Sequence, residues 1–401
     1  MSKKNDDFFI KKKSWSIVKD ELLGYYFKPY ISKILHTQRP VLYVDCFAGK
    51  GKFEDGKPGS PIIALDIINE CLDRTSVNYI PKVYSVFIDL NYADDLAINL
   101  CNYSDIRILS GKYEEKIFEV LKNKDGYNVF LYIDPYGIKA LDCSIFDSLA
   151  LKNFNSIELL INMNSFGFIR EACHALGTSF DNNEIFNDLI EYDSTRYDTS
   201  DKSIDDLNRI AGGDYWQRII NDYKLSKIDG YEAEKIFSEQ YCNRLMKMYK
   251  FVLNMPMRIK EGQHPKYRLI HATNHRDGCL LMVDNIYNRW QALQEIQNNQ
   301  QLSLFETDFD NNIISNDDIN KKVIDYFSKC ESDSPLCNEL ARFFVKNGAV
   351  CSVSKVKDIL KYLERNGNII FRRIPDKTKS GKPTRFMDEK KGQKVFIRWT
   401  K

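Results

Sequence analysis

The spacing of apolar residues changes along the chain, and the change predicts a helix followed by repeated strand–helix units. From residue 14 to residue 36, apolar side chains return every three or four positions, which is typical of an amphipathic helix. After Pro40, short apolar runs alternate with helical stretches, a pattern that indicates βαβ units and a mostly parallel sheet. The predicted strands are Val41–Phe47, Val83–Asp89, Ile106–Leu109, Val129–Asp134 and Ile157–Ile161.

The pattern weakens after the fifth predicted strand. We interpret residues of about 175–250 as a helical insertion, whose first part is polar and only weakly periodic. Two extended runs, Phe251–Ile259 and Tyr267–Thr273, follow with Gly and Pro between them, which predicts an antiparallel hairpin at the sheet edge. A helix of about 278–297 closes this α/β domain, which we expect to span residues 1–296.

The last part of the chain has the pattern of a separate, smaller domain. A Gln- and Asn-rich stretch, 297–312, is the predicted linker, and residues 313–401 form the domain. Three helical segments precede two extended runs, Ile369–Ile374 and Val395–Trp399, which predicts a winged helix-turn-helix whose third helix enters a major groove. Its candidate nucleic-acid-binding residues, at i, i+4 and i+8 of the third helix, are Lys357, Lys361 and Arg365.

Charge is distributed unevenly along the chain, although the net charge is only +2. Residues 321–401 contain 20 Lys and Arg against 9 Asp and Glu, a net charge of +11, whereas residues 1–320 have a net charge of −9. Clustered basic residues favour binding to phosphate groups, so this block predicts a nucleic-acid partner. A solvated basic surface without a partner is the alternative.

Composition excludes several classes of protein. Hydrophobic residues make up 43% and charged residues 28%, which excludes a mainly disordered chain, a collagen-like chain and a coiled-coil rod. No run of 18 apolar residues occurs, so we expect no membrane span, and the polar segment Met1–Lys13 predicts a cytoplasmic protein. The ten Cys residues lack CxxC pairs and zinc-type spacing, so we expect reduced, mostly buried thiols and no metal site.

A glycine-rich motif directly follows the first predicted strand. Gly49 and Gly51 permit a tight turn and a close approach of the backbone to a ligand, and Asp45 offers a carboxylate to a positively charged amine. The order acid-x-Phe-Ala-Gly-x-Gly, which includes Phe47, resembles the first motif of class I S-adenosyl-L-methionine (AdoMet)-dependent methyltransferases, particularly those that act on nucleic acids. A purely structural turn is the alternative interpretation.

The second predicted strand also ends in an acid, Asp89. In nucleotide-binding α/β folds such a carboxylate accepts hydrogen bonds from the ribose hydroxyls, and its place after the glycine motif favours that role. Asp89 follows Gly51 at more than the usual spacing of about 20 residues, and the loop 52–59 accounts for part of the excess. An N-terminal cap of the next helix is the alternative.

The fourth predicted strand ends in Asp134-Pro135-Tyr136-Gly137, which resembles the Asp-Pro-Pro-Tyr motif of amino-group methyltransferases acting on bases. The resemblance implies that Asp134 and the Pro135 carbonyl orient the target amine and that Tyr136 stacks on the base. One proline of the motif is missing here, and a simple turn after a core strand is the alternative. The segment at the end of the fifth strand, Asn162-Met163-Asn164-Ser165-Phe166-Gly167, is a candidate lining of the substrate side, and a strand-to-helix turn with Asn and Ser caps is the alternative.

The motifs taken in order resemble the three-Cys-motif partner proteins. The segments that carry the resemblance are Asp45–Pro61, Tyr132–Leu141, Glu158–Arg170 and Tyr267–Asn274. It implies a doubly wound, Rossmann-like (class I methyltransferase) α/β fold with a C-terminal winged helix. It also implies AdoMet as the cofactor and association with a phage-type protein that carries a three-cysteine motif.

We therefore expect an AdoMet-dependent methyltransferase that acts on a nucleobase nitrogen in DNA or RNA. Two alternatives remain: a non-catalytic, AdoMet- or nucleotide-binding partner of a three-Cys-motif protein, and a methyltransferase whose substrate is a protein or a small molecule. The segment Gln301–Phe305 resembles the peptide by which bacterial replication and repair proteins dock on the sliding clamp. Packing of its apolar residues on the body of the protein is the alternative for that segment.

Overall fold

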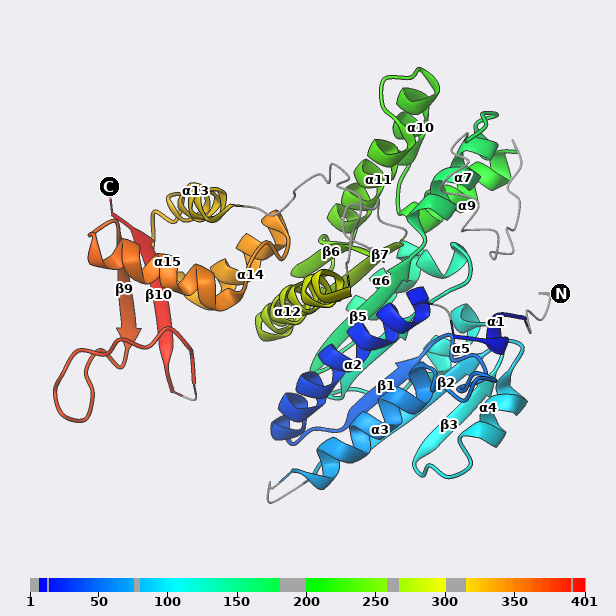
Figure 1. Ribbon diagram of the computed structural model, residues 1–401, viewed down its shortest axis with the longest axis horizontal. Coiled ribbons are helices and arrows are strands. Elements are labelled where there is room, and N and C mark those ends of the chain that lie inside the picture. The colour runs from blue at the N-terminus through cyan, green and yellow to red at the C-terminus, as the bar shows by residue number, and fades with distance from the viewer. Residues whose placement is uncertain are drawn as a thin grey trace. The chain divides into compact units, whose positions relative to one another are not determined.

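The computed structural model describes residues 7–12, 14–75, 80–180, 200–257, 267–300, 315–390 and 392–400. The chain divides into two compact units, residues 1–274 and 275–401. Figure 1 shows the helices and strands of both units, and each unit is described here by itself.

A seven-stranded sheet forms the centre of the first unit, in the order β3-β2-β1-β4-β5-β7-β6. All neighbouring strands are parallel except where β7 pairs with β5 and with β6. The strands are β1 (Val41–Asp45), β2 (Val83–Asp89), β3 (Ile106–Ser110), β4 (Asn128–Ile133), β5 (Ser156–Met163), β6 (Phe251–Met257) and β7 (Tyr267–Thr273). This mostly parallel sheet matches a Rossmann-like methyltransferase fold and confirms the predicted sheet, with the antiparallel pair at its edge.

The strand order reverses between β1 and β4, which creates a switch point in the sheet. From β1 the chain winds outward to β2 and β3, and from β4 it winds outward to β5. Right-handed crossovers therefore place the connecting helices on opposite faces of the sheet. Ligands of open α/β sheets bind outside the carboxyl ends of the strands at such a point.

Helix α2 (Ser14–Ile34) confirms the first predicted helix and packs beside α3 (Ser60–Asp73), as Figure 1 shows. Its rings Phe27 and Tyr30 pack on Phe130 of β4, with centroids 5.2 and 5.0 Å apart. Lys19, about two to three turns before these rings in α2, contacts Asp134 just beyond β4. The helix therefore begins at the carboxyl end of the sheet, where the glycine motif also lies.

Short helices complete the connections between the strands of the first unit. They are α1 (Asp7–Ile10), α4 (Ala93–Asn99), α5 (Tyr113–Val120), α6 (Cys143–Ala150) and α7 (Ser165–Ala175). The predicted insertion is helical where it is described, as α9 (Asp201–Ala211), α10 (Tyr215–Lys224) and α11 (Gly230–Leu245). Its residues 181–199 lie outside the described part of the chain.

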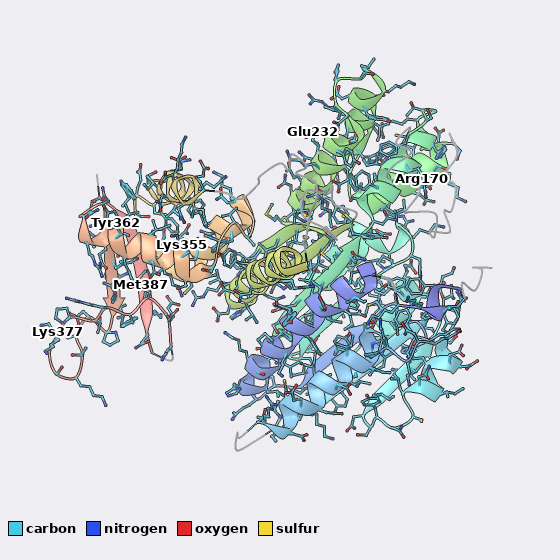
Figure 2. All side chains as sticks on the ribbon, in the orientation of Figure 1. Arg170, Glu232, Lys355, Tyr362, Lys377 and Met387 are labelled. Atoms are coloured by element: carbon cyan, nitrogen blue, oxygen red, sulfur yellow. The ribbon has the colours of Figure 1, made fainter. Side chains whose placement is uncertain are left out.

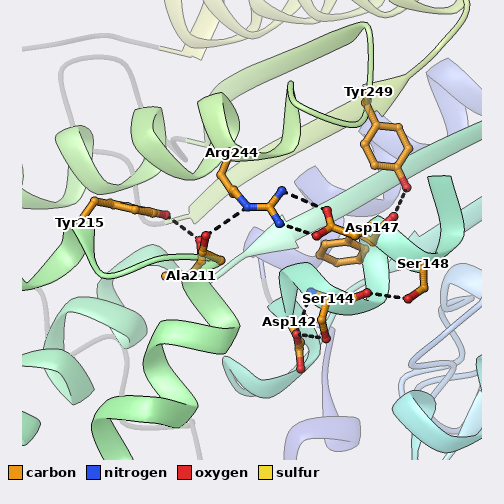
Figure 3. Close-up of polar contacts among 10 residues, drawn as sticks. Asp142, Ser144, Asp147, Ser148, Ala211, Tyr215, Arg244 and Tyr249 are labelled. Carbon is orange, nitrogen blue, oxygen red and sulfur yellow. Dashed lines mark hydrogen bonds and ion pairs between the residues drawn. The ribbon is translucent and has the colours of Figure 1, made fainter. Parts of the chain in front are cut away.

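The insertion is tied to α6 by buried and half-buried polar contacts, which Figure 3 shows. Arg244 of α11 forms two hydrogen bonds with Asp147 of α6 and donates a third, 3.1 Å long, to the Gly212 carbonyl after α9. Tyr249 donates to the Phe146 carbonyl at 2.9 Å. These contacts make the helices a part of the α/β unit.

The described residues of the second unit form four helices and a three-stranded sheet, in the order β8-β10-β9. Its elements are α12 (Arg276–Gln300), α13 (Asn316–Phe327), β8 (Ser334–Pro335), α14 (Leu336–Asn347), α15 (Val353–Arg365), β9 (Ile369–Ile374) and β10 (Lys394–Trp399). The three predicted helices and the hairpin are present. The two-residue strand β8 was not predicted, because Ser334-Pro335 reads as a helix start.

The boundary between the units differs from the expected linker at 297–312. Helix α12 packs on α14 and α15, and Arg276 at its start bonds Asn338 at 3.3 Å and forms an ion pair with Glu389. The helix that we assigned to the end of the α/β domain therefore belongs to the second unit. Residues 301–314, with the clamp-like segment Gln301–Phe305, lie outside the described residues.

The remaining global features concern cysteines, metal sites and membrane spans. All ten cysteines are free, and all except Cys101 are buried, as predicted. The described residues contain no group of three or more His, Cys, Asp and Glu that could hold a metal ion. Among the described helices, none combines the length and the apolar character needed to cross a bilayer.

Candidate functional site

A cavity of about 60 Å³ lies at the carboxyl ends of β1 and β4, at the switch point of the sheet. Six of the predicted site residues line it, and they are Phe47, Gly49, Gly51, Asp134, Pro135 and Tyr136. Further lining residues come from α1, from α2 and from the loop before α3, and they are Phe8, Phe9, Ser16, Lys19, Asp20, Ala48, Lys52, Phe53, Gly59 and Ser60.

The glycine motif forms a turn that only glycine can make without strain. Gly49 and Gly51 have φ values of +58° and +76°, in the left-handed region. A Cβ atom at Gly51 would lie 2.7 Å from Cδ1 of Leu96, and one at Gly49 would lie 3.0 Å from the Phe9 ring. The turn therefore needs glycine for its backbone angles and for the closeness of its neighbours.

Asp45 is fully buried behind the cavity instead of facing it. Its carboxylate accepts hydrogen bonds from Ser60 Oγ at 2.7 Å and from the Phe47 amide at 3.2 Å. Burial raises the pKa of Asp45 to about 7, and the two hydrogen bonds oppose part of that rise. Ser60, which lines the cavity, connects this carboxylate to the space in front of it.

Asp89 is also buried, and its carboxylate holds two parts of the chain together. Oδ2 accepts a hydrogen bond of 2.8 Å from the Gly49 amide, and Oδ1 accepts bonds of 2.8 Å from the amides of Asn91 and Tyr92. The second pair orders the turn before α4, whose N-cap residue is Tyr92, so Asp89 is not itself the cap that the alternative interpretation proposed. The first bond braces the glycine turn.

Asp134 lies in an ion pair that the sequence did not indicate. Lys19 Nζ contacts both carboxylate oxygens, at 2.7 and 2.5 Å, and Asn162 Nδ2 donates to Oδ1 at 2.7 Å. The Lys19 side chain is only 7% exposed and that of Asp134 22% exposed. In the same segment, Asn164 caps α7, because its side chain accepts a hydrogen bond of 2.8 Å from the Gly167 amide, as the alternative interpretation of that segment requires.

One face of α2 supplies polar residues that sequence reasoning missed. Ser16, Lys19 and Asp20, at i, i+3 and i+4, all line the cavity. Ser16 Oγ is buried and has no hydrogen-bond partner among the described residues. Asp20 forms an ion pair of 2.5 Å with Lys12, and burial raises its pKa to about 6 against the influence of that lysine. Polar residues at helical spacing among buried aromatic residues were the available signal.

Tyr136 lies at the mouth of the cavity, with 38% of its surface exposed. Its ring meets the edge of Phe8 with centroids 5.6 Å apart and planes at 84°. Partial burial and the charge of Asp134 raise the pKa of its phenol, so the hydroxyl stays protonated at neutral pH. The ring, and not the hydroxyl, is therefore the group that it offers to a partner.

The predicted basic stripe lies on α15 of the second unit, but acidic residues occupy part of it. Lys357 forms an ion pair with Asp388 and its side chain is 16% exposed, and Lys361 pairs with Asp358 at 2.9 Å. Arg365 is exposed. Figure 2 labels two further residues of this helix, Lys355 and Tyr362, and the Tyr362 ring is 63% exposed.

Comparisons with known proteins add little to this picture. No protein-family model and no curated protein matches the chain. Among solved structures, loganic acid methyltransferase with SAH aligns at 10% identity over 66% of this chain and 96% of that one, with a TM-score of 0.29. PKMT2 from Rickettsia typhi aligns at 11% identity over 85% and 73%, with a TM-score of 0.28.

A third structure, the selenomethionine-substituted CurJ carbon methyltransferase, aligns at 12% identity over 59% of this chain and 49% of that one, with a TM-score of 0.26. Two of these proteins are methyltransferases by description. Superpositions at such TM-scores carry no functional argument, and the fold assignment rests on the strand order. The resemblance to three-Cys-motif partner proteins continues to rest on the motifs.

Proposed function

We propose that this protein is an AdoMet-dependent methyltransferase that acts on an amino nitrogen of a nucleobase in DNA or RNA. The observation that carries the proposal is the meeting of two motifs at one cavity. The positive-φ glycine turn after β1 and the Asp134–Gly137 segment after β4 are 83 or more residues apart in the chain and converge at the switch point of the sheet.

The charges around the cavity fit the proposed cofactor. Three carboxylates, Asp20, Asp45 and Asp134, lie in or behind the cavity. The charge of Asp134 adds to the rise in the pKa values of Asp20 and Asp45, and two buried lysines form ion pairs here, Lys12 with Asp20 and Lys19 with Asp134. When all five groups are ionised, the set carries one negative charge. A positively charged ligand is stabilised in such surroundings, and it would also lower the pKa of Asp45.

The residues that would hold AdoMet are the backbone at Gly49 and Gly51 with Phe47, Asp45 and Asp89. When bound, AdoMet supplies a methyl group on a positively charged sulfur. Asp89 keeps the glycine turn in its positive-φ shape through the Gly49 amide. Asp45 acts through Ser60, because the hydroxyl that it orients is the group that lines the cavity.

On the acceptor side, we propose that Asp134 and the Pro135 carbonyl receive hydrogen bonds from the target amine. Lys19 and Asn162 hold the Asp134 carboxylate in one orientation through their hydrogen bonds. The half-exposed ring of Tyr136 offers a surface on which a flipped or single-stranded base can stack, an interaction typically worth ~1–3 kcal/mol per base.

The second unit supports a nucleic-acid partner. Its order of elements, with β8 pairing to β10 and β10 to β9, supports the winged helix-turn-helix assignment. The loop between β9 and β10 adds exposed basic residues to those of α15, and they are Lys377, Lys379, Lys382 and Arg385. We place the nucleic acid on these residues and on Lys357, Lys361 and Arg365. Association with a three-Cys-motif protein and a cytoplasmic location remain part of the proposal.

A specific observation favours a second candidate, a non-catalytic AdoMet- or nucleotide-binding protein. Both oxygens of Asp134 already accept hydrogen bonds from Lys19, so an incoming amine would meet an acceptor that is in use. In that case, the ion pair would be a permanent part of the structure and no methyl group would be transferred. A third candidate is a methyltransferase whose methyl acceptor is a protein or a small molecule. In that case, this protein is expected not to bind nucleic acid.

The test is incubation with isotopically labelled AdoMet and total nucleic acid, with and without the three-Cys-motif partner, followed by analysis of methylated nucleosides. The wild-type protein is expected to give a methylated base. Asp134→Ala is expected to lose that product while calorimetry still detects bound AdoMet. Equal product from both proteins, or no product from the wild type in any condition, would refute the catalytic proposal.

A further inference from the structure

The N-terminal segment of residues 7–12 fills the space directly over the glycine turn. The Phe9 side chain is 4% exposed, and its ring lies 4.9 Å from the Tyr92 ring and 5.7 Å from the Phe53 ring, measured between centroids. Its Cζ atom is 3.0 Å from the point where a Cβ would stand on Gly49. Any ligand that approaches this turn must therefore take the place of the Phe9 ring.

A few polar contacts hold the segment in place. The Glu54 amide donates to the Phe9 carbonyl at 2.8 Å, and the Lys12 amide donates to Asp55 at 3.2 Å. Lys12 Nζ donates to the Pro58 carbonyl at 2.6 Å and pairs with Asp20 at 2.5 Å. All of these partners come from the loop before α3 or from α2, so the segment is a flap over the cavity and not a part of the sheet.

The groups that the segment places in the site resemble the proposed ligands in chemistry. Phe9 puts a flat ring over the glycines, and Lys12 puts a positive charge against the carboxylate of Asp20. Phe8 puts a second ring against Tyr136, on the surface that we assigned to the target base. AdoMet would bring a flat adenine ring and a positive charge to the site, and a nucleobase would bring a second flat ring.

The remaining cavity is too small for such a ligand. It measures about 60 Å³, which accommodates a few water molecules, whereas sites for small organic ligands usually measure about 300–1,000 Å³. The glycine turn and the acidic residues are already in place around it. Withdrawal of residues 7–12 is the change that would enlarge it without disturbing the sheet.

We propose that residues 8–12 are an intramolecular competitor of the cofactor and of the target base, so that the site is autoinhibited until this segment withdraws. The identity of the displaced ligand rests on the proposed function. The measured affinity for AdoMet is then the intrinsic affinity reduced by the fraction of molecules whose segment is withdrawn. A partner or a nucleic acid that binds the withdrawn segment would activate the site.

The experiment measures AdoMet binding by calorimetry in the full-length protein and in two variants that weaken the segment by different means. Phe8→Ala removes a half-buried ring, and Lys12→Met removes the charge that pairs with Asp20 but keeps the length of the side chain. Both variants are expected to bind AdoMet at least about tenfold more tightly than the wild type. Lys28→Met, which removes an ion pair with Glu70 elsewhere on α2, is the matched control and should bind like the wild type.

Trypsin cleavage after Lys11 and Lys12, followed by mass spectrometry, reports on the segment without reference to activity. Saturating AdoMet is expected to accelerate cleavage in the wild type, because the ligand displaces the segment. Slower trypsin cleavage in the presence of AdoMet, or weaker AdoMet binding in both variants, would show that the segment closes over the ligand. Either result would refute the proposed competition.

The two proposals fail in different ways. If wild type and variants bind AdoMet equally, the cofactor assignment stands and the competition alone is wrong. If no protein binds AdoMet although Phe8→Ala, which keeps both trypsin sites, is cleaved faster than the wild type, the cofactor assignment is wrong, and the proposed competition with AdoMet is wrong with it.

Discussion

Replacement of Asp45 by Asn should stabilise the protein at neutral pH, because this carboxylate is buried and has no cationic partner among the residues that the structure describes. Its hydrogen bonds come from the Ser60 hydroxyl and from the Phe47 amide. An Asn side chain can still accept the bond from the Phe47 amide, and the Ser60 hydroxyl can turn to accept a bond from the Asn side-chain amide. Burial raises the pKa of Asp45 to about 7 from its ordinary value of 3.8. A group whose pKa is higher in the folded state binds more protons when folded, so its ionisation lowers stability as the pH rises.

The size of the effect follows from the two pKa values. Each unit of pKa difference corresponds to about 1.4 kcal/mol, so the ionised carboxylate costs at most about 4 kcal/mol at pH 8. The same relation gives about 2 kcal/mol at pH 5 and less than about 1 kcal/mol at pH 4. Asp45→Asn should therefore exceed the wild type in free energy of unfolding at pH 8, and the difference should shrink as the pH falls.

The assay is urea unfolding at pH values from 5 to 8, which compares the wild type with Asp45→Asn and with a control. Asp205→Asn, a change of an exposed aspartate in α9, should leave the free energy of unfolding unaltered at every pH. A variant at position 45 that is less stable than the wild type at pH 8 would refute the reasoning. A difference that does not change with pH would refute it as well.

Three further outcomes are expected. In urea unfolding, Gly51→Ala should destabilise the protein by about 2–4 kcal/mol, since position 51 combines a positive φ with a Cβ contact of 2.7 Å. Its control, Gly56→Ala, should cost only about 1–2 kcal/mol in the same assay, because position 56 has a positive φ but open space around it. Lys19→Met should cost about 2–3 kcal/mol in urea unfolding at pH 7, because it leaves a half-buried carboxylate without its cation. In the second unit, Arg365→Ala should weaken nucleic-acid binding in a salt titration more than Lys357→Ala does, because Lys357 is already paired with an acid; equal losses would argue against this ranking.

Much of the fold could be predicted from the sequence because the relevant signals are local. Each parallel strand is a short apolar run, and the observed β1 and β4 are buried along their whole length, as that pattern requires. The glycine turn was equally visible, since positive φ angles at Gly49 and Gly51 depend on residues that adjoin in the chain. The predicted third helix ends at Arg365, directly before Asn366-Gly367, for the same local reason.

The boundary of the units and the short strand β8 depended on longer-range contacts. Helix α12 follows the sheet in sequence, but its contacts are with α14 and α15, and a hydrophobic pattern does not say which surface will cover it. Ser334-Pro335 has the composition of a helix start, and only the pairing of Pro335 with Phe396 makes it a strand. Propensity yields to tertiary pairing at such positions.

The site shows the same division between local and tertiary information. The sequence by itself determined that Asp45, Asp89 and Asp134 stand at the ends of strands, because a strand and the residue that terminates it are neighbours in the chain. Only the tertiary structure decided what each carboxylate meets: Lys19 lies 115 residues from Asp134, and the amide that Asp89 holds lies 40 residues away. Burial and charge pairing arise when distant segments pack together. The same packing laid Phe9 over the glycine turn.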